Sequence, residues 1–428
     1  MLSKPFFGYA KPRFQYELLS TALPQPASVA STGAMTVLLP REMGPAPSPL
    51  LKPGTRVKTG QRLTWDDQPG PSVIATATGV IQSVAPHLGD YGRKFTAITI
   101  APESADEWDE QFAEASRQAD RQLLIDYLCN VPGAPALDKL ADPKKPVDTI
   151  VIYGGDTDLL VDTNLYILKS QTAMVNEGIH ALKEIAGVDK ILLAVPSDSF
   201  QNFDGHFEAD VRAVPNTYPH GQPLMVFYQL FGKILDQGER FEDHGVLFMR
   251  AEAVAAIGKA MTDGRIPLDK VVTVLDKQGG KHLVAARVGT PIGAILGRFD
   301  ISLEDRDRLI FGGPMTGTAV YSEDQPVLAD TDAILVQDSR DIILTSDYPC
   351  INCGECVRIC PSKMAVNLLV RFLEVGQYQE GADLYDLYSC VECGLCSFVC
   401  VSRIPILQYI KLAKYELARA VPAEEENE

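Results

Sequence analysis

The chain has 428 residues, enough for about two to four domains, and its 46% hydrophobic and 22% charged content is ordinary for globular protein. The formal net charge of −17 argues against nucleic acid and anionic lipid as broad partners, and it predicts a basic surface on a protein partner. We find no apolar run of about 18 residues and no secretory pattern, so we expect no transmembrane segment and no export.

Residues 1–30 are rich in aromatic residues and prolines and predict an extended N-terminal arm that packs on another domain or subunit. Residues 31–103 then read as short strands between glycine turns. The pattern PG-x-x-V-x-x-GQ-x-L over residues 53–63 resembles a lipoyl-like barrel-sandwich hybrid. Its expected hairpin tip, Trp65–Pro71, holds no lysine, which favours a structural or docking role over acyl carriage.

Residues 104–265 predict a Rossmann-like domain. After a helix expected at Glu110–Leu128, strands alternate with helices, and this alternation is typical of a parallel sheet. The expected strands are Thr149–Tyr153, Lys190–Val195, Val211–Val214 and Gly245–Met249, and the expected helices are Leu165–Ile185, Pro223–Leu235 and Ala251–Met261. Ligands of such sheets bind at the carboxyl ends of the strands, so Gly154–Asp158 and Pro215–Gly221 are candidate positions.

Residues 266–338 return to β-rich character, with a short helix expected at Pro291–Leu296. Their most distinctive feature is a glycine-rich turn, Gly312–Gly317, directly after an expected strand. This turn is either a plain tight turn or a contact to a nucleotide or flavin, and the sequence leaves both interpretations open.

Residues 339–420 carry eight of the nine cysteines, and only Cys129 lies elsewhere. Two runs share the spacing C-x-x-C-x-x-C-x-x-x-C, which is the bacterial ferredoxin pattern. In this pattern three cysteines ligate one cube and the fourth ligates the other, which predicts two [4Fe–4S] clusters. The first cluster is assigned to Cys350, Cys353, Cys356 and Cys400, and the second to Cys390, Cys393, Cys396 and Cys360.

Structural zinc and disulfides are the alternatives for these cysteines. Zinc would use two pairs and leave the remaining cysteines without a role, and disulfides need an oxidising compartment. The insert of about thirty residues between the runs favours a helical dicluster domain over the compact two-cluster ferredoxin. Residues 421–428 form an acidic, solvated tail.

This order of domains resembles the RnfC family, the peripheral subunit of the Rnf ion-translocating ferredoxin:NAD⁺ oxidoreductase. The strongest matches are Pro45–Gln61, Arg287–Pro291, Gly312–Gly317 and Cys350–Lys414. The resemblance implies that the Rossmann-like domain is similar to the flavin subunit of respiratory complex I. It also implies that residues 266–338 are a β-grasp module of the SLBB type.

In the family, that Rossmann-like domain holds FMN and NADH through a glycine-rich loop and an acidic strand end. This chain departs at both places. The loop aligns with residues 130–136, where only Gly133 remains and two prolines remove amide donors. The strand end keeps Gly154 and Gly155, with Asp156 and Asp158 in place of the acidic pair. These five residues are candidates for an FMN and NADH site that is weakened or lost.

The resemblance therefore implies an electron-transfer iron–sulfur subunit of a membrane-associated complex. It would relay electrons between other subunits of that complex, with ferredoxin or a flavoprotein as further partners, on the cytoplasmic face of the inner membrane. An FMN-dependent NADH dehydrogenase module and a cobalamin-reductase-like subunit are the alternatives. No catalytic side chain is expected if the chain is such a relay.

Overall fold

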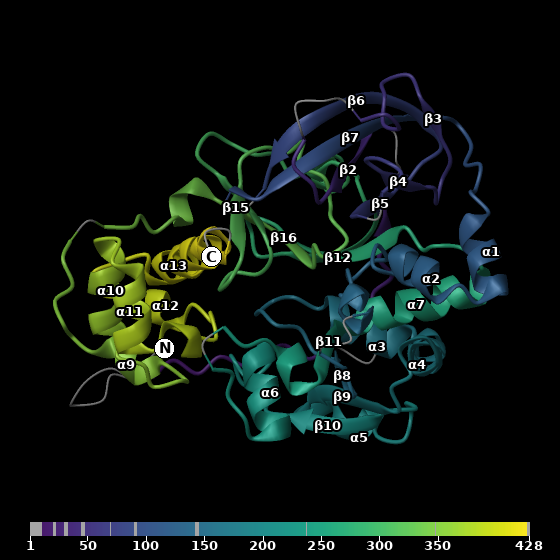
Figure 1. Cartoon of the computed structure of the whole chain (residues 1–428). Helices are drawn as coiled ribbons and strands as arrows, with labels where there is room; N and C mark the ends of the chain where they lie inside the picture. The colour runs from purple at the N-terminus through teal and green to yellow at the C-terminus, as the bar shows by residue number, and fades with distance from the viewer. Residues whose placement is uncertain are drawn as a thin grey trace.

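The computed structural model describes residues 11–19, 23–29, 33–43, 48–68, 70–89, 92–141, 145–236, 238–346 and 348–425, the last five without their side chains. Figure 1 shows a helical lobe, yellow, at one side of three β-containing parts. Parts of the expected N-terminal arm (1–10, 20–22 and 30) and of the acidic tail (426–428) lie outside the described residues.

The first β-rich part contains a four-stranded antiparallel sheet and a small hairpin. Its strands are β2 (Met35–Leu39), β3 (Arg56–Val57), β4 (Arg62–Thr64), β5 (Ser72–Ile74), β6 (Gly79–Leu88) and β7 (Lys94–Pro102). Val37 and Leu39 on β2 face Ile98 and Ile100 on β7 in a common core, because alternate side chains of a strand point to the same side.

The predicted parallel sheet is present, in the order β10-β9-β8-β11. Its strands are β8 (Thr149–Tyr153), β9 (Lys190–Pro196), β10 (Asp210–Val214) and β11 (Val246–Arg250). The helices of this part are α1 (Gln111–Gln118), α2 (Arg121–Leu128), α3 (Thr163–Ser170), α4 (Thr172–Ala186), α5 (Phe200–Phe203), α6 (Pro223–Phe231) and α7 (Ala251–Asp263). Ile150 and Ile152 of β8 face the core shared with α4 and α7, whereas Val151 faces α6.

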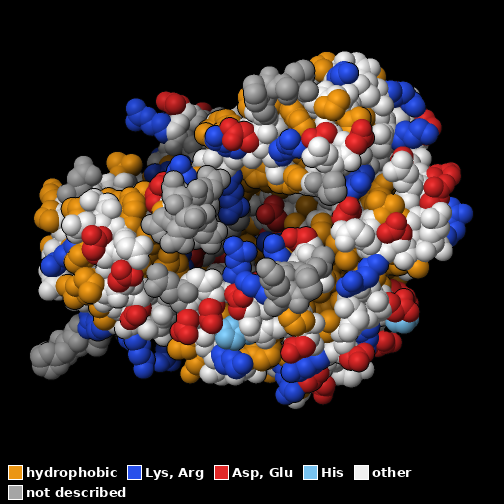
Figure 2. All heavy atoms as spheres, viewed as in Figure 1, with side chains coloured by type: hydrophobic (Ala, Val, Ile, Leu, Met, Phe, Trp, Pro, Cys, Tyr) orange, Lys and Arg blue, Asp and Glu red, His pale blue; other side chains and the backbone are white. Residues whose placement is uncertain are grey.

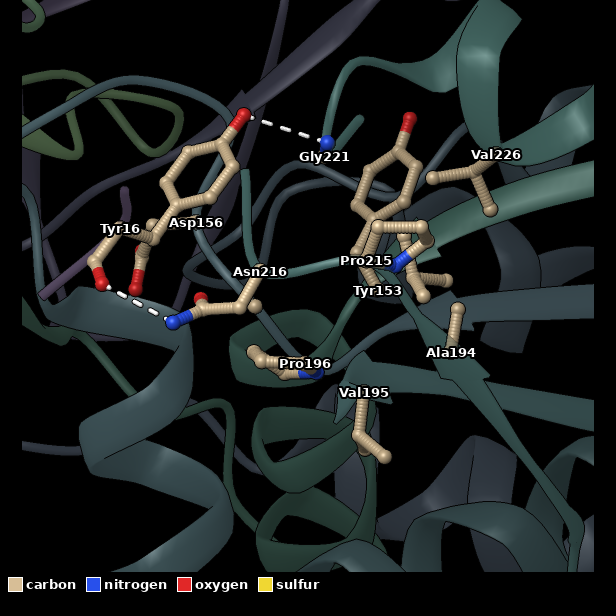
Figure 3. Close-up of a pocket in the computed structure, with 12 residues that line it drawn as sticks. Tyr16, Tyr153, Asp156, Ala194, Val195, Pro196, Pro215, Asn216, Gly221 and Val226 are labelled. Carbon is tan, nitrogen blue, oxygen red and sulfur yellow. Dashed lines mark hydrogen bonds between the residues drawn. The ribbon is translucent and has the colours of Figure 1, made fainter. Parts of the chain in front are cut away.

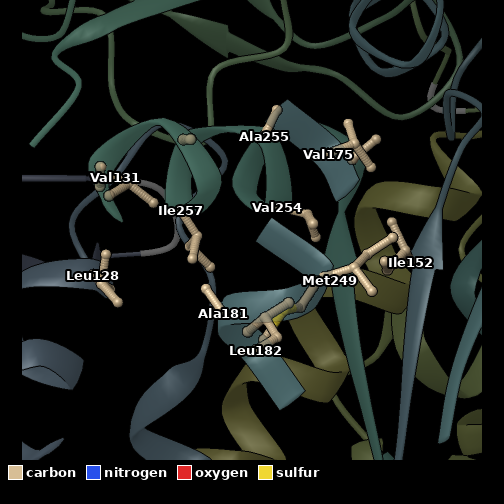
Figure 4. Packing of buried hydrophobic residues seen from close by; sticks show 14 of the residues in the cluster. Leu128, Val131, Ile152, Val175, Ala181, Leu182, Met249, Val254, Ala255 and Ile257 are labelled. Carbon is tan, nitrogen blue, oxygen red and sulfur yellow. The ribbon is translucent and has the colours of Figure 1, made fainter. Parts of the chain in front are cut away.

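The helices α4 and α7 pack against each other over this sheet, and Figure 4 shows side chains of their shared core, among them Val175, Leu182 and Val254. A Cβ atom on Gly178 of α4 would stand 1.9 Å from the Val254 carbonyl oxygen, and one on Gly258 of α7 would stand 2.0 Å from the Met174 carbonyl oxygen. Each helix therefore uses a glycine where it crosses the other.

A mixed six-stranded sheet, ordered β1-β13-β12-β16-β14-β15, lies between the first β-rich part, the parallel sheet and the lobe. Its strands are β1 (Ala27–Ser28), β12 (Asp269–Leu275), β13 (Lys281–Arg287), β14 (Arg308–Phe311), β15 (Thr318–Val320) and β16 (Ala333–Gln337), and α8 (Ile292–Gly297) lies among them. The edge strand β1 comes from the N-terminal arm and runs parallel to β13.

The helical lobe contains both cysteine runs. Its helices are α9 (Glu355–Ile359), α10 (Val366–Glu374), α11 (Tyr378–Tyr385), α12 (Leu395–Phe398) and α13 (Ile406–Glu425). The last helix continues into the segment that the sequence assigned to the tail. Leu369, Leu373 and Ile410 form part of a separate core that packs against the cysteines.

Two helices that the sequence predicted as continuous are broken. The first breaks at Ala119, whose left-handed conformation ends α1, and Asp120 then caps α2 by accepting a hydrogen bond from Leu123 N. The second breaks at Gln171, between Ser170 and Thr172, whose hydroxyls donate to backbone carbonyls four residues earlier. Such bonds bend helices.

Acidic and basic side chains are interspersed over the face that Figure 2 shows, so the net charge does not gather into one acidic field there. Among the described helices, none combines the length and the apolar character needed to cross a membrane.

Candidate functional site

The structure brings the eight cysteines of the lobe together in two sets of four, and each set takes one member from the other run. Cys350, Cys353, Cys356 and Cys400 line one pocket. Burial raises the pKa of Cys356 to about 11, and the other three thiols of this set add to the increase. The two sets are those predicted from the ferredoxin spacing.

The second set is more deeply buried than the first. Burial raises the pKa of Cys393 to about 12 and that of Cys390 to about 11, and it also raises the pKa of Cys396. Cys390, Cys393 and Cys360 add to the effect on Cys396, which places Cys360 with this set. Burial thus favours the neutral thiol over the thiolate, so binding iron would release protons.

The two runs have the same backbone conformation, which follows their repeated spacing. The residue two positions after the first cysteine, Asn352 or Glu392, has a φ of 58° or 55°. The glycine four positions after the first cysteine, Gly354 or Gly394, has a φ of 76° or 73°, and it directly precedes α9 or α12. Glycine adopts this left-handed conformation without a steric penalty, which accounts for a glycine at this position of each run.

The cysteine side chains fit the ligation of iron–sulfur clusters. All nine cysteines lie within the described residues and are unpaired, so none forms a disulfide. In the described ranges, no group of three or more His, Cys, Asp or Glu side chains is arranged to hold a metal ion. The cysteines of the first set surround a pocket instead, as the ligands of a cube must, and thiolates are the ligands that such clusters take.

Backbone amides point at two of the sulfurs. Glu392 N donates to Cys390 Sγ and Ile404 N donates to Cys400 Sγ, each at 3.4 Å. Hydrogen bonds of this kind to cluster sulfurs are one of the means by which proteins tune cluster potentials.

The second predicted site lies at the carboxyl ends of β8, β9 and β10. Figure 3 shows this crevice, which Gly155, Asp156, Asn216 and Gly221 line. The structure thus brings the two predicted segments, 154–158 and 215–221, together. The enclosed space is only about 30 Å³, which is room for roughly one water molecule and far too little for an isoalloxazine ring.

The N-terminal arm fills the crevice. Gln15 forms a β-bridge with Thr217, and Tyr16 exchanges hydrogen bonds with Asn216: Tyr16 N to Asn216 O, 3.4 Å, and Asn216 Nδ2 to Tyr16 O, 3.2 Å. Gly221 N donates to the Tyr16 hydroxyl at 3.2 Å (Figure 3), and that hydroxyl donates to Thr157 O at 3.5 Å. The arm was predicted to pack on another domain or subunit, and this part of it packs on the parallel-sheet part of the same chain.

The two aspartates predicted as an acidic pair each have a structural partner. Asp156 accepts hydrogen bonds from Asn164 N, 2.9 Å, and Leu165 N, 3.3 Å, in the first turn of α3. Burial nevertheless raises its pKa to about 8, and the charges of Asp332 and Asp162 add to this rise. The carboxyl group is therefore about half protonated near pH 8.

Asp158 holds the glycine-rich turn of residues 312–317 against the parallel sheet. Its Oδ2 accepts from Thr316 N at 2.8 Å and from Thr316 Oγ1 at 2.7 Å, and both oxygens accept from Met315 N at 3.2 Å. Burial raises the pKa of Asp158, and the hydrogen bonds from Thr316 oppose that rise. The turn therefore contacts an aspartate of its own chain.

Gly133, the remaining glycine of the expected flavin loop, offers no free backbone group to a phosphate. Its N–H donates to Ala329 O at 2.6 Å, and its carbonyl accepts from Arg250 Nη1 at 3.1 Å. A Cβ on Gly133 would stand 2.5 Å from Ala253 N, so the loop lies directly on α7. Gly154 N likewise donates to Ala194 O, at 2.7 Å. The residues present do not fit FMN.

Sequence reasoning missed the side chains that connect this crevice to the lobe. Tyr218 Oη donates to Cys393 O at 2.5 Å, and the ring of Tyr218 lies 5.7 Å from that of Tyr16. Phe14 makes an edge contact with Phe398, at 5.1 Å between ring centroids. The aromatic crowding of residues 1–30 was the available signal, but it did not show which surface these rings cover.

Known proteins share the cysteine runs and most of the chain around them. Residues 349–405, which hold both runs, match a family model described as a 4Fe-4S dicluster domain. Over 402 residues the chain is 29% identical to RnfC, a subunit of the ion-translocating oxidoreductase complex, from Yersinia pestis bv. Antiqua (strain Antiqua), and the match covers 90% of this chain and 65% of the relative.

This chain is a homologue of the RnfC proteins. Proteins of the same name from Edwardsiella ictaluri (strain 93-146) and Pasteurella multocida (strain Pm70) are 28% and 27% identical over 90% and 87% of this chain, and it covers 50% and 47% of them. The RnfC-like chain thus spans about half to two thirds of the length of these relatives.

Among solved structures, the chain is similar to a chain of the NAD⁺-reducing [NiFe]-hydrogenase in the H2-reduced state. The TM-score is 0.45 at 13% sequence identity, and the match covers 74% of this chain and 66% of that chain.

Proposed function

We propose that this RnfC-like chain is an electron-transfer subunit that holds two [4Fe–4S] clusters and has lost the binding of FMN and NADH. The observation that carries the proposal is the exchange of Cys360 and Cys400 between the two cysteine runs. Such an exchange is the pattern of two-cluster ferredoxins. The first cluster would be held by Cys350, Cys353, Cys356 and Cys400, and the second by Cys390, Cys393, Cys396 and Cys360.

The domains we propose are an arm at 1–30, a barrel-sandwich hybrid at 31–103 and a Rossmann-like domain at 104–265. An SLBB-like β-grasp module at 266–338, a dicluster domain at 339–420 and the tail at 421–428 complete the chain. In this arrangement the clusters supply one-electron transfer when bound. The protein contributes thiolates, amide donors to sulfur, and burial that excludes water.

The first set of cysteines faces a surface suited to a protein partner. Cys353 is exposed, and exposed large hydrophobic residues line the pocket of this set and the pocket beside Cys400: Ile343, Leu344, Ile351, Phe398 and Val401. Figure 2 shows hydrophobic side chains along the outer edge of the lobe. We propose that this face exchanges electrons with another subunit of a membrane complex, with ferredoxin or with a flavoprotein.

The local charge at this face differs from that of the whole chain. In the pocket beside Cys400, the described lining residues include Arg308 and Arg403 and no carboxylate. An acidic partner therefore suits this face better than the basic partner that the net charge predicted. A position on the cytoplasmic side of the inner membrane, through such partners, follows from the proposal.

The two alternative functions have less support. An FMN-dependent NADH dehydrogenase needs a phosphate cradle and space for a flavin, and neither Gly133 nor the crevice around Tyr16 offers them. For a cobalamin-reductase-like subunit, no feature of the described residues favours it over the relay.

Anaerobic purification with iron and sulfide reconstitution tests the proposal. Two clusters predict about eight irons and eight sulfides per chain, and FMN supplied in excess should be lost on desalting. Cys129→Ser is the matched control and should retain the same iron content. About four irons per chain, or stoichiometric FMN after desalting, would contradict the proposal.

A further inference from the structure

A cavity of about 280 Å³ lies where α6 faces the helical lobe, close to the lower end of the volumes typical of ligand pockets. One wall consists of α6 and the segment that follows it, including Leu224, Tyr228 and Ile234. The other consists of two short stretches of the lobe, 361–362 and 388–391. It shares no lining residue with the crevice that Tyr16 fills.

This cavity adjoins the second set of cysteines. Pro361 follows Cys360 directly, and Ser389 and Val391 flank Cys390 on both sides. Under the proposed function, on which this step rests, a molecule bound here would lie beside the second cluster. The cavity is thus placed for a ligand that accepts electrons.

The chemistry of the walls selects against charged ligands. Among the described lining residues there is no Lys, Arg, His, Asp or Glu side chain. A phosphate or carboxylate would lose its hydration here without a compensating charge, which is costly. FMN and NADH are therefore unsuited to this cavity, and an uncharged ligand is favoured.

Aromatic and hydroxyl side chains further define the ligand. Phe227, Tyr228 and Tyr388 offer ring surfaces for stacking. The hydroxyls of Ser362, Tyr388 and Ser389 have no hydrogen-bond partner among the described residues, so they are free to donate. Donors on one side of an apolar slot suit a planar molecule with carbonyl oxygens at its edge.

We propose that this cavity binds an uncharged quinone, held between α6 and the cysteine-flanking stretches of the lobe. Tyr228 and Ile234 stand at the open side of the cavity, since they are 52% and 69% exposed. Leu224 packs along the ring, and hydroxyls of the lobe donate to the carbonyl oxygens. The crevice that Tyr16 fills, at the carboxyl ends of β8, β9 and β10, takes no part in this binding.

Equilibrium dialysis under argon tests the proposal on the full, cluster-loaded chain with oxidised clusters. The probe is 2,3-dimethyl-1,4-naphthoquinone, which has no free ring position for thiol addition. Saturable binding of one equivalent is expected, with a dissociation constant of about 100 µM or tighter. Leu224→Trp fills the cavity and should weaken binding at least about tenfold, whereas the matched Leu88→Trp, on the exposed end of β6, should leave it unchanged.

Tyr388→Phe removes one donor and should weaken binding about fivefold, the value of one neutral hydrogen bond. If Leu224→Trp does not fold, Ile234→Trp at the open side replaces it. Binding that is absent, non-saturable or unaffected by filling the cavity would overturn the proposal, as would binding of riboflavin in place of the quinone.

Iron and sulfide are counted on the same samples. A full cluster content without quinone binding overturns this inference alone, whereas a chain that assembles no clusters overturns the proposed function.

Discussion

Asp156 and Asp158 lie two residues apart after β8, yet they serve different parts of the molecule. Asp156 accepts hydrogen bonds from the first turn of α3, and Asp158 holds the turn of residues 312–317. Both carboxyls are buried, at 8% and 4% exposure, so neither is available to orient a nicotinamide. Their positions resemble those of a cofactor site, but their contacts are those of structural residues.

The hydrogen bonds between Asp158 and the turn of residues 312–317 predict a large loss of stability when the Asp158 side chain is removed. Asp158→Ala would leave the amides of Met315 and Thr316 and the Thr316 hydroxyl without an acceptor, at a cost of about 3 kcal/mol in the free energy of unfolding. Urea denaturation measures this loss. Asp305→Ala, at a fully exposed carboxyl, is the control and should change stability by less than about 0.5 kcal/mol. Equal effects of the two substitutions would show that the hydrogen bonds of Asp158 do not contribute to stability.

The raised pKa of Asp156 predicts a pH dependence of stability. Its folded pKa of about 8 lies above the ordinary value of 3.8, so the folded chain binds this proton more tightly than the unfolded chain. The associated stability is fully present below about pH 4 and is lost as the pH rises toward 8. Stability of the native chain relative to Asp156→Asn should therefore fall by more than about 1.4 kcal/mol between pH 5 and pH 8.5. A flat difference across this range would contradict the prediction.

At the scale of elements, the N-terminal arm adds a strand to one sheet and fills the crevice at the edge of another. Residues 14–16 pair with residues 216–218, and β1 adds to the edge of the six-stranded sheet. An ion pair anchors this segment, because Glu17 Oε2 lies 2.7 Å from Lys281 Nζ. The arm therefore contributes both to the closed crevice and to the packing of Tyr218 against Cys393.

Tyr16→Ala tests whether the arm alone excludes a flavin. Removal of the partly buried ring should lower the free energy of unfolding by about 2 kcal/mol, and the control Tyr321→Ala, at a 79% exposed ring, should have little effect. FMN fluorescence should show no binding to the variant, because Gly133 still donates to Ala329 O. Tight FMN binding by Tyr16→Ala would show that the arm is the only obstacle.

At the scale of the whole molecule, the exchange of the fourth cysteine ties the two runs into one unit. The sequence predicted the exchange from spacing alone, because the ferredoxin pattern fixes which thiols reach which cube. It also predicted the parallel sheet, because strands and helices with distinct hydrophobic periods alternate there. These features depend on local patterns and need no knowledge of long-range contacts.

The closed crevice could not be predicted in the same way. Tyr16 and Asn216 are 200 positions apart, and the partners of Asp158 and Gly133 are also distant in sequence: Thr316 and Ala329. The sequence showed that glycines were missing from the loop and left the function of Gly312–Gly317 open. Only the folded chain shows that protein groups occupy the donors and the space a flavin would need.

Paired cysteine substitutions test the exchange. Cys353→Ser alone should reduce iron from about eight to about four per chain, and adding Cys400→Ser should remove no more, since both serve the same cluster. Adding Cys360→Ser instead should remove both clusters. Iron counts after reconstitution measure this, with Cys129→Ser as the control. The opposite pattern for the two double variants would assign each run to its own cluster.

Reduction by NADH is the measurement that tests the relay most directly. The cluster-loaded chain is incubated anaerobically with excess FMN and NADH, and its visible and electron paramagnetic resonance spectra are compared with those after dithionite. The relay predicts reduced clusters with dithionite and no reduction with NADH. Clusters that NADH reduces in an FMN-dependent way would contradict it and would make the chain a flavin-dependent dehydrogenase.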